Sequence, residues 1–333
     1  MTALRVLFNT VEAIDAADVF PRLKALGVGA VSVFCELDRA ELHPNLRAAA
    51  EQFGEVNANL MHAATFHDEP GWEKKLRADC ARLIPELAAL GVDNYPWMIE
   101  CNLYGYRWHP LLGSFAGGGT LAERFSAFYE AAHEANPHAN VIIVPYPHRL
   151  INQSYGRGGW KDWWVRLGER LEFDRVALDA HVGVWIAAPT DGSVQRHLRD
   201  AVSFLKERGH DPIYVEVGYP THGFKPLAGL YGWGREKDQA AMLKTCYTEL
   251  SDLGVPWMQI CECIDPAGEQ VYDSRLMGDE GRVPKAFGIV PVSEERHWGL
   301  LNADGSEKEA CEWVAEVAKG SGTFATFRTG SIV

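Results

Sequence analysis

The sequence predicts an α/β fold, a single-domain (β/α)8 TIM barrel. Three observations support this prediction. Short apolar runs alternate with amphipathic stretches along the chain, several of these stretches end at glycine, and the 333 residues exceed the about 250 that such a barrel needs. Strict alternation indicates a parallel sheet, because each crossover helix returns the chain to begin the next strand in the same direction. Eight such units close most simply as a barrel.

The predicted strands are eight short apolar runs. In chain order they lie at residues 4–11, 28–34, 57–64, 95–101, 141–146, 175–182, 213–217 and 255–264. The predicted helices are the amphipathic stretches between and after these runs, the third being the longest and the fifth rich in tryptophan. They lie at residues 16–26, 44–53, 72–90, 121–135, 160–171, 194–208, 237–253 and 307–319. Gly27 and Gly91 directly follow the first and third helices, where glycine readily adopts the left-handed conformation that ends a helix.

A doubly wound open sheet is the main alternative for an alternating chain. It is disfavoured because no glycine-rich phosphate-binding loop follows the first strand. No low-complexity tract or linker divides the sequence. We therefore expect residues 1–320 to form one barrel, and the small, polar stretch 321–333 to be a C-terminal tail.

The charge and the cysteines exclude several classes of protein. The 32 lysines and arginines are outnumbered by 45 aspartates and glutamates, which gives a net charge of −13. Nucleic acid is therefore not an expected partner, because phosphate binding needs a positive surface. No apolar run approaches the about 18 residues of a membrane-spanning helix, and the first residues lack the apolar core of a signal peptide. The seven cysteines are an odd number, and several lie in apolar runs, which indicates reduced thiols in a cytoplasmic protein.

Polar side chains close each predicted strand. In a parallel barrel the catalytic groups lie at the C-terminal ends of the strands. The residues found there are Asn9, Glu36, His62, Glu100 with Asn102, Tyr146 with His148, Asp179 with His181, Glu216, and Glu262 with Asp265. Packing alone would not place glutamates at the close of three apolar runs. The sequence therefore predicts a polar site at one end of the barrel.

Two of these glutamates suit the cleavage of a glycosidic bond. That reaction needs one protonated carboxyl group for the leaving oxygen and one ionised carboxylate for the anomeric carbon, and a separation of about 5 Å gives retention through a covalent intermediate. Glu100 and Glu216 end the fourth and seventh strands, which can face each other across a barrel mouth. Sugar rings also pack on aromatic side chains. Of the eleven tryptophans, Trp298 is our candidate for one wall of a sugar subsite.

Several segments resemble clan A glycoside hydrolases, the (β/α)8-barrel retaining glycosidases. The segment 214–221, Tyr-Val-Glu-Val-Gly-Tyr-Pro-Thr, resembles their strand-seven nucleophile segment, in which a glycine, an aromatic residue and often a proline follow the glutamate. The segment 297–308 is similar to the one after their eighth strand. The layout of 97–102 and 134–141 is similar to the acid/base strand and the entry to strand five, and 179–181 to the strand-six region that holds the nucleophile.

The resemblance implies a retaining glycosidase that acts on an oligosaccharide or glycoside, with Glu216 as nucleophile and Glu100 as acid/base. In the family the acid/base directly follows an asparagine, whereas the order here is Glu100-Cys101-Asn102. Residues 100 and 102 share one face of a strand, so Glu100 is expected near the mouth in either register. The residues expected to contact substrate are Asn102, His181, Asp179, Tyr219, Glu262, Asp265, Trp298, Glu36 and Asn9. We expect no cofactor and no metal. The sugar, the linkage and the oligomeric state stay open.

Two alternatives remain from the sequence. The segment 175–181 also resembles the strand-six metal segment of xylose-isomerase-like barrels, and with Glu216, Glu262 and His62 it would hold a divalent cation for sugar isomerisation or epimerisation. Against this, the segment 145–148 at the end of strand five, Pro-Tyr-Pro-His, lacks the carboxylate that those enzymes place there. The displaced Asn102 also leaves open a non-catalytic carbohydrate-binding barrel.

Overall fold

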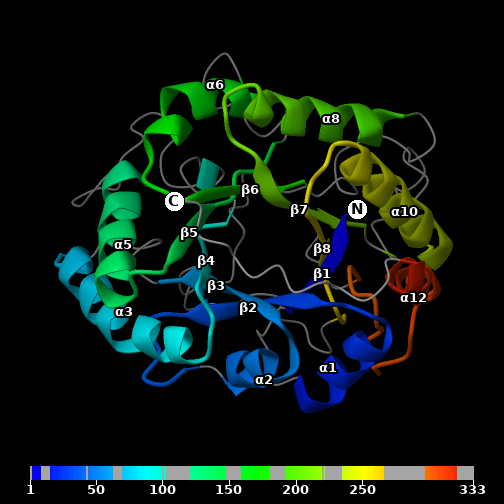
Figure 1. The fold of residues 1–333 in the computed structure, drawn as a ribbon, viewed down its shortest axis with the longest axis horizontal. Coiled ribbons are helices and arrows are strands. Elements are labelled where there is room, and N and C mark those ends of the chain that lie inside the picture. The colour runs from blue at the N-terminus through cyan, green and yellow to red at the C-terminus, as the bar shows by residue number, and fades with distance from the viewer. Residues whose placement is uncertain are drawn as a thin grey trace.

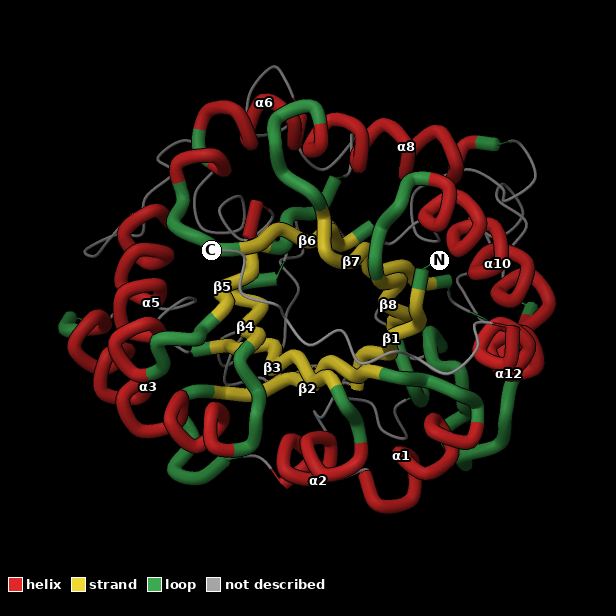
Figure 2. Tube along the Cα trace, viewed as in Figure 1, coloured by secondary structure: helices red, strands yellow, loops and turns green. Residues whose placement is uncertain are grey.

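Eight parallel strands form a closed barrel in the computed structural model, each pairing with the next in sequence and β8 with β1. Figures 1 and 2 show the strands as an inner ring that the helices surround. The strands are β1 (Ala3–Phe8), β2 (Ala30–Glu36), β3 (Glu55–Met61), β4 (Asn94–Trp97), β5 (Asn140–Ile143), β6 (Arg175–Asp179), β7 (Pro212–Gly218) and β8 (Trp257–Cys261). The structure describes residues 2–8, 16–42, 44–62, 70–99, 101–102, 121–147, 159–180, 192–219, 221, 235–265 and 297–320.

The helices lie between and after the strands. They are α1 (Ala16–Ala25), α2 (Pro44–Gln52), α3 (Trp72–Ala89), α5 (Leu121–Ala135), α6 (Gly159–Arg166) with a 3-10 turn at Gly168–Arg170, α8 (Ser193–Lys206), α10 (Glu236–Asp252) and α12 (Ala310–Gly320). Within the described ranges, no helix has both the length and the apolar character to cross a membrane.

The predicted fold class is confirmed, and each predicted strand and helix overlaps an element of the structure. Two bounds differ for physical reasons. Strand β4 ends at Trp97 rather than at residue 101, because Met98 adopts a left-handed conformation with φ 48°. Asn102 therefore lies in a helical turn and not on a strand face, which corrects that expectation. Helix α12 begins at Ala310 rather than at residue 307, because the backbone of Glu307 bridges Leu301 and the N–H of Lys308 donates to the carbonyl oxygen of Leu300 at 3.0 Å.

The outer face of the barrel packs against the helices and forms the main hydrophobic core. Trp97 of β4 stacks on Phe128 of α5 with ring centroids 4.0 Å apart. Phe8 of β1 meets Phe20 of α1 edge-on at 5.0 Å. Such aromatic pairs bury large apolar areas, so they hold the helical layer onto the strands.

The inner face of the barrel is divided between apolar and polar side chains. The apolar part is a small cluster of four buried residues: Ile142, Val144, Ala177 and Tyr214. In the polar part, Arg5 of β1 forms an ion pair with Glu55 of β3, and its guanidinium carbon lies 5.5 Å from the ring centroid of Tyr214 on β7. Since β1 neighbours neither β3 nor β7, these contacts cross the interior. Side chains alternate along a strand, so Asn57 and Asn59 face the interior together with Glu55.

Candidate active site

Three polar residues form a row across the last strands of the barrel. Asp179 of β6 is in register with Glu216 of β7, which is in register with Gln259 of β8. Gln259 accepts a hydrogen bond of 2.5 Å from the hydroxyl of Ser32 on β2. Strand β1 separates β2 from β8, so this contact crosses the interior. The row therefore points into the barrel, where Glu216 is 2% and Asp179 1% exposed.

Two donors from β8 hold the carboxylate of Glu216. The amide nitrogen Nε2 of Gln259 donates to its Oε2 atom, and the thiol of Cys261 also donates to this carboxylate. Burial, and then the carboxylates of Glu216, Glu262 and Asp179, raise the pKa of the Cys261 thiol well above its usual range. The thiol therefore keeps its proton and acts as a donor. Hydrogen bonds to the charged form of a carboxyl group favour that form.

Asp179 differs chemically from Glu216, its neighbour in the row. Complete burial raises the pKa of Asp179 well above the usual range of an aspartate. A buried carboxyl group keeps its proton because the low dielectric penalises the charge. The row thus combines a carboxyl group that favours protonation with one that receives donated hydrogen bonds.

Trp298 lies over the end of β7. A methyl group at Gly218 would come 2.3 Å from Cε3 of the Trp298 ring and 2.9 Å from the carbonyl oxygen of Cys261. Only a residue without a side chain fits there. The glycine two residues after Glu216 therefore allows the aromatic ring to approach the strand that carries the glutamate.

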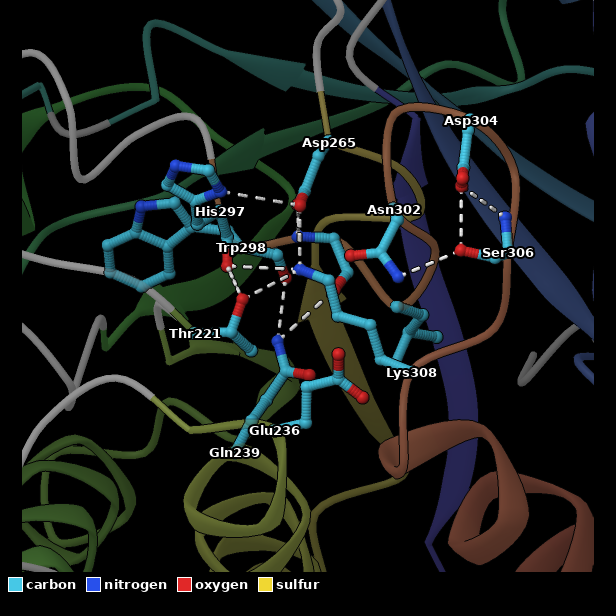
Figure 3. Close-up of polar contacts among 12 residues, drawn as sticks. Thr221, Glu236, Gln239, Asp265, His297, Trp298, Asn302, Asp304, Ser306 and Lys308 are labelled. Carbon is cyan, nitrogen blue, oxygen red and sulfur yellow. Dashed lines mark hydrogen bonds and ion pairs between the residues drawn. The ribbon is translucent and has the colours of Figure 1, made fainter.

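A buried ion pair connects the segments that follow β7 and β8 (Figure 3). The ammonium group of Lys308 lies 2.9 Å from Oδ1 and 2.8 Å from Oδ2 of Asp265, and it also donates to the hydroxyl of Thr221 at 2.9 Å. The backbone N–H of Gly299 donates to Asp265 at 2.7 Å. The Asp265–Lys308 pair thus ties together the Trp298 segment, Thr221 and the start of α12.

The amide of Gln239 on α10 reinforces the same junction (Figure 3). Its Nε2 atom donates to the backbone oxygens of Tyr219 at 3.0 Å, Trp298 at 3.1 Å and Gly299 at 3.2 Å. Tyr219 itself is buried, and burial raises the pKa of its hydroxyl to about 12. Tyr219, Asp265 and Trp298, all expected at the site, are therefore packed together beside the end of β7.

Other residues expected at the site lie elsewhere around the mouth. Asn102 donates to the carbonyl oxygen of Tyr146 at 2.9 Å and accepts from its N–H at 2.7 Å, so it holds the chain just beyond β5. Glu36 ends β2 and accepts from Arg39 at 2.6 Å. Glu262 is buried directly after β8. Substrate contact by these residues stays a prediction.

Three expected site residues, Glu100, His181 and Asn9, lie outside the described residues. His62, part of the alternative cation site, follows β3 but bonds Asp79 of α3 at 3.0 Å, on the side of the strand that faces the helix. Among the residues that the structure describes, no three His, Cys, Asp or Glu side chains form a group that would hold a metal ion.

Ser32 and Gln259 were not among the predicted site residues, and Cys261 was interpreted as a small apolar residue. Ser32 and Gln259 occur inside apolar runs rather than at their ends. For Ser32 a signal was available, because it lies four residues before Glu36 and side chains alternate along a strand, so both are on the same face. For Gln259 there was no such signal, because the mouth residue predicted on its strand was Glu262, three residues away and so on the opposite face.

With this geometry the chain can be compared with known proteins. No protein family model matches it, and no curated protein matches it in sequence. Solved structures do resemble it. A family 39 glycoside hydrolase from the gut symbiont Bacteroides cellulosilyticus WH2 is 12% identical with a TM-score of 0.59, over 95% of this chain and 63% of that one. An exo-β-1,4-mannosidase from Opitutaceae bacterium strain TAV5 is 14% identical with a TM-score of 0.62, over 96% of this chain and 60% of that one.

A third similar structure is Bacteroides uniformis β-glucuronidase 2, covalently bound to a cyclophellitol-6-carboxylate aziridine. It is 12% identical with a TM-score of 0.63, over 96% of this chain and 35% of that one. These neighbours are glycoside hydrolases. The chain shares their barrel and spans 35% to 63% of their length. The shared barrel agrees with the fold that the resemblance of the sequence motifs implied.

Proposed function

We propose that the protein is a glycoside hydrolase that cleaves a glycosidic bond with retention, with Glu216 as the nucleophile. One observation carries the proposal: Glu216 points into the barrel near the C-terminal end of β7, and two donors from β8 hold its carboxylate. The C-terminal end of the strands is where the reactions of this fold occur. The fold shared with glycosidases and the sequence around Glu216 support the same assignment.

The proposed reaction has two steps. Glu216 attacks the anomeric carbon while Glu100 gives a proton to the departing oxygen, which leaves a glycosyl ester on Glu216. Glu100 then takes a proton from water, the water oxygen attacks the anomeric carbon, and Glu216 leaves as a carboxylate. The donors Gln259 and Cys261 stabilise the charge that Glu216 carries before the first step and after the second. Trp298, which covers Gly218, is assigned as the wall on which the apolar face of the sugar packs.

Covalent labelling tests the nucleophile before the sugar is known. The purified protein is treated with a panel of neutral and carboxylated cyclophellitol aziridines and then digested for peptide mass spectrometry. We expect an adduct on the peptide that contains Glu216, and none on Glu216→Gln. The matched control is Glu249→Gln, which changes a buried glutamate of α10 that pairs with Arg199, and this variant should label like the wild type. An adduct on another carboxylate would overturn the assignment.

Hydrolysis gives the second readout of the same prediction. On the aryl glycoside that the wild type cleaves best, Glu216→Ala should lose on the order of 10⁴-fold in kcat, as when one member of a catalytic set is removed. Azide should restore turnover and give the inverted glycosyl azide, because the small anion occupies the place of the carboxylate. Sugar binding without labelling or hydrolysis would instead support a carbohydrate-binding barrel.

A further inference from the structure

Ser32, Gln259 and Glu216 form a continuous line of hydrogen bonds inside the barrel. The hydroxyl of Ser32 lies 2.5 Å from Oε1 of Gln259, and Nε2 of Gln259 donates to Oε2 of Glu216. Ser32 and Gln259 are completely buried. The three residues come from β2, β8 and β7, so the line runs across the interior beside β1.

The chemistry of the groups fixes the direction of this line. An ionised carboxylate only accepts hydrogen bonds, so Gln259 must present its NH2 group to Glu216. The carbonyl oxygen of Gln259 then faces Ser32, whose hydroxyl must donate to it. Without Ser32, the amide has no donor from β2 to keep it from turning over and presenting its oxygen to the carboxylate. Ser32 thereby selects the amide orientation that Glu216 requires.

We propose that Gln259 is a positioning residue for the nucleophile and that Ser32 keeps its amide in the required orientation. The proposal rests on Glu216 being the nucleophile. A neutral amide orients the carboxylate and lowers the free energy of its charged form without adding a positive charge beside the anomeric carbon. Because Glu216 is buried, removal of this donor leaves a charge with less hydrogen bonding to offset its desolvation.

Other titratable groups lie around Glu216 on the neighbouring elements, and a substitution at Gln259 changes none of these residues. They are Asp179 on β6, Tyr214 on β7 itself, Cys261 on β8 and Glu262 directly after it, with Arg5 of β1 over the Tyr214 ring. A difference in pH dependence between the wild type and a Gln259 variant therefore reports the loss of the Gln259 amide.

The test compares the pH dependence of labelling and turnover among variants of the line. In Gln259→Leu, the acid limb of kcat/KM and of the labelling rate should move to higher pH by about one to two units, which corresponds to loss of a hydrogen bond to a charged group. At the optimum, kcat should fall on the order of 10- to 100-fold while KM changes little, because orientation rather than binding is lost.

Gln259→Glu keeps the shape and replaces the donor by a carboxyl group, so it should move the acid limb in the same direction. Ser32→Ala should cause a smaller shift, and Ser32→Thr, which keeps the hydroxyl, should restore the wild-type profile. Ser251→Ala on α10 is the control for removal of a serine hydroxyl outside the barrel, and its profile should not change.

The outcomes separate this inference from the proposed function. If the wild type is not labelled at Glu216, the function fails. If the wild type is labelled there, and a folded Gln259→Leu protein keeps the wild-type rate and acid limb, the inference on Gln259 is wrong. If Gln259→Leu does not fold, the acid limb is measured instead in the isosteric Gln259→Glu, Ser32→Ala and Ser32→Thr variants. An unchanged acid limb in Gln259→Glu and Ser32→Ala would then show that the inference is wrong.

Discussion

At the scale of single residues, the surroundings of Gly218 limit what can follow the nucleophile on β7. The Trp298 ring and the Cys261 carbonyl oxygen occupy the volume that a side chain at this position would need. The backbone that carries the ring is held in place, because Gln239 bonds the carbonyl oxygens of Trp298 and Gly299. The methyl group of an alanine would therefore displace Trp298 from the position assigned to it beside the sugar.

Gly218→Ala is expected to lower the free energy of unfolding by about 1–3 kcal/mol, as overpacking does, and to slow the labelling of Glu216. Urea denaturation and labelling kinetics measure the two effects. The control is Gly54→Ala, because a methyl group there meets nothing within 4 Å. In a Trp298→Ala background the Gly218→Ala change should be milder, since the two residues are in contact. Equal losses of stability in Gly218→Ala and Gly54→Ala would contradict a steric conflict at Gly218.

The residues of the site were predictable to different degrees. Glu216 stands out because its neighbours in the sequence form a motif. Gln259 and Ser32 do not stand out in the sequence, because their roles depend on side chains of β2 and β8 that meet across β1. A single sequence does not show which side chains meet in the interior. The position of Asn102 was misjudged because the apolar run continues past Trp97 while the backbone turns at Met98.

At the scale of elements, the ion pair of Asp265 and Lys308 joins the ends of β7 and β8 to α12. The side chain of Lys308 is 0% exposed and that of Asp265 is 6% exposed, so neither charge is solvated by bulk water. The local pattern predicts a helix from residue 307, but the backbone of Glu307 and Lys308 pairs with residues 300–301, so the helix starts at Ala310. A helix boundary set by such backbone pairing cannot be predicted from apolar periodicity.

Lys308→Met is expected to lower the free energy of unfolding by about 3–5 kcal/mol, because it leaves the Asp265 carboxylate buried without its partner. The exposed pair Arg47–Glu86, with side chains 53% and 43% exposed, is the control, and Arg47→Met should change stability by less than about 1 kcal/mol. The double variant Lys308→Met with Asp265→Leu should recover much of the loss. Urea denaturation measures the free energy of unfolding of each variant. Similar losses for Lys308→Met and Arg47→Met would show that the buried pair is not a structural clamp.

At the scale of the whole molecule, the outside of the barrel was predictable and the inside was not. The alternation of apolar and amphipathic segments depends only on local sequence, and it predicted all eight strands and their order. The inner face carries Arg5, Asn57 and Asn59 within runs that were interpreted as apolar strands, and Glu55 just before one of them. Burying a polar side chain costs free energy unless it is hydrogen-bonded or paired, as Arg5 and Glu55 are, so these interior residues do not follow from the apolar pattern that predicted the strands.

The stability of the molecule depends on pH through the buried carboxyl group of Asp179. Burial raises the pKa of Asp179 in the folded state, so the folded protein binds this proton more tightly than the unfolded chain does. The contribution of Asp179 to stability is therefore complete below the usual aspartate pKa of about 3.9, and it is lost as the pH rises from there through the raised folded pKa. At neutral pH the protein must either keep the proton or bury a charge.

Asp179→Asn removes this requirement, because the amide of asparagine is neutral at every pH. The variant should be more stable than the wild type at about pH 7.5, and the gain should shrink toward about pH 4, where the wild-type carboxyl group is protonated in both states. Differential scanning calorimetry of both proteins at the two pH values measures the change in Tm. Asp252→Asn, at an exposed position at the end of α10, should give the same Tm difference from the wild type at both pH values. A gain for Asp179→Asn that is equal at both pH values would show that folding does not raise the pKa of Asp179, and a loss that grows with pH would show that folding stabilises its ionised form.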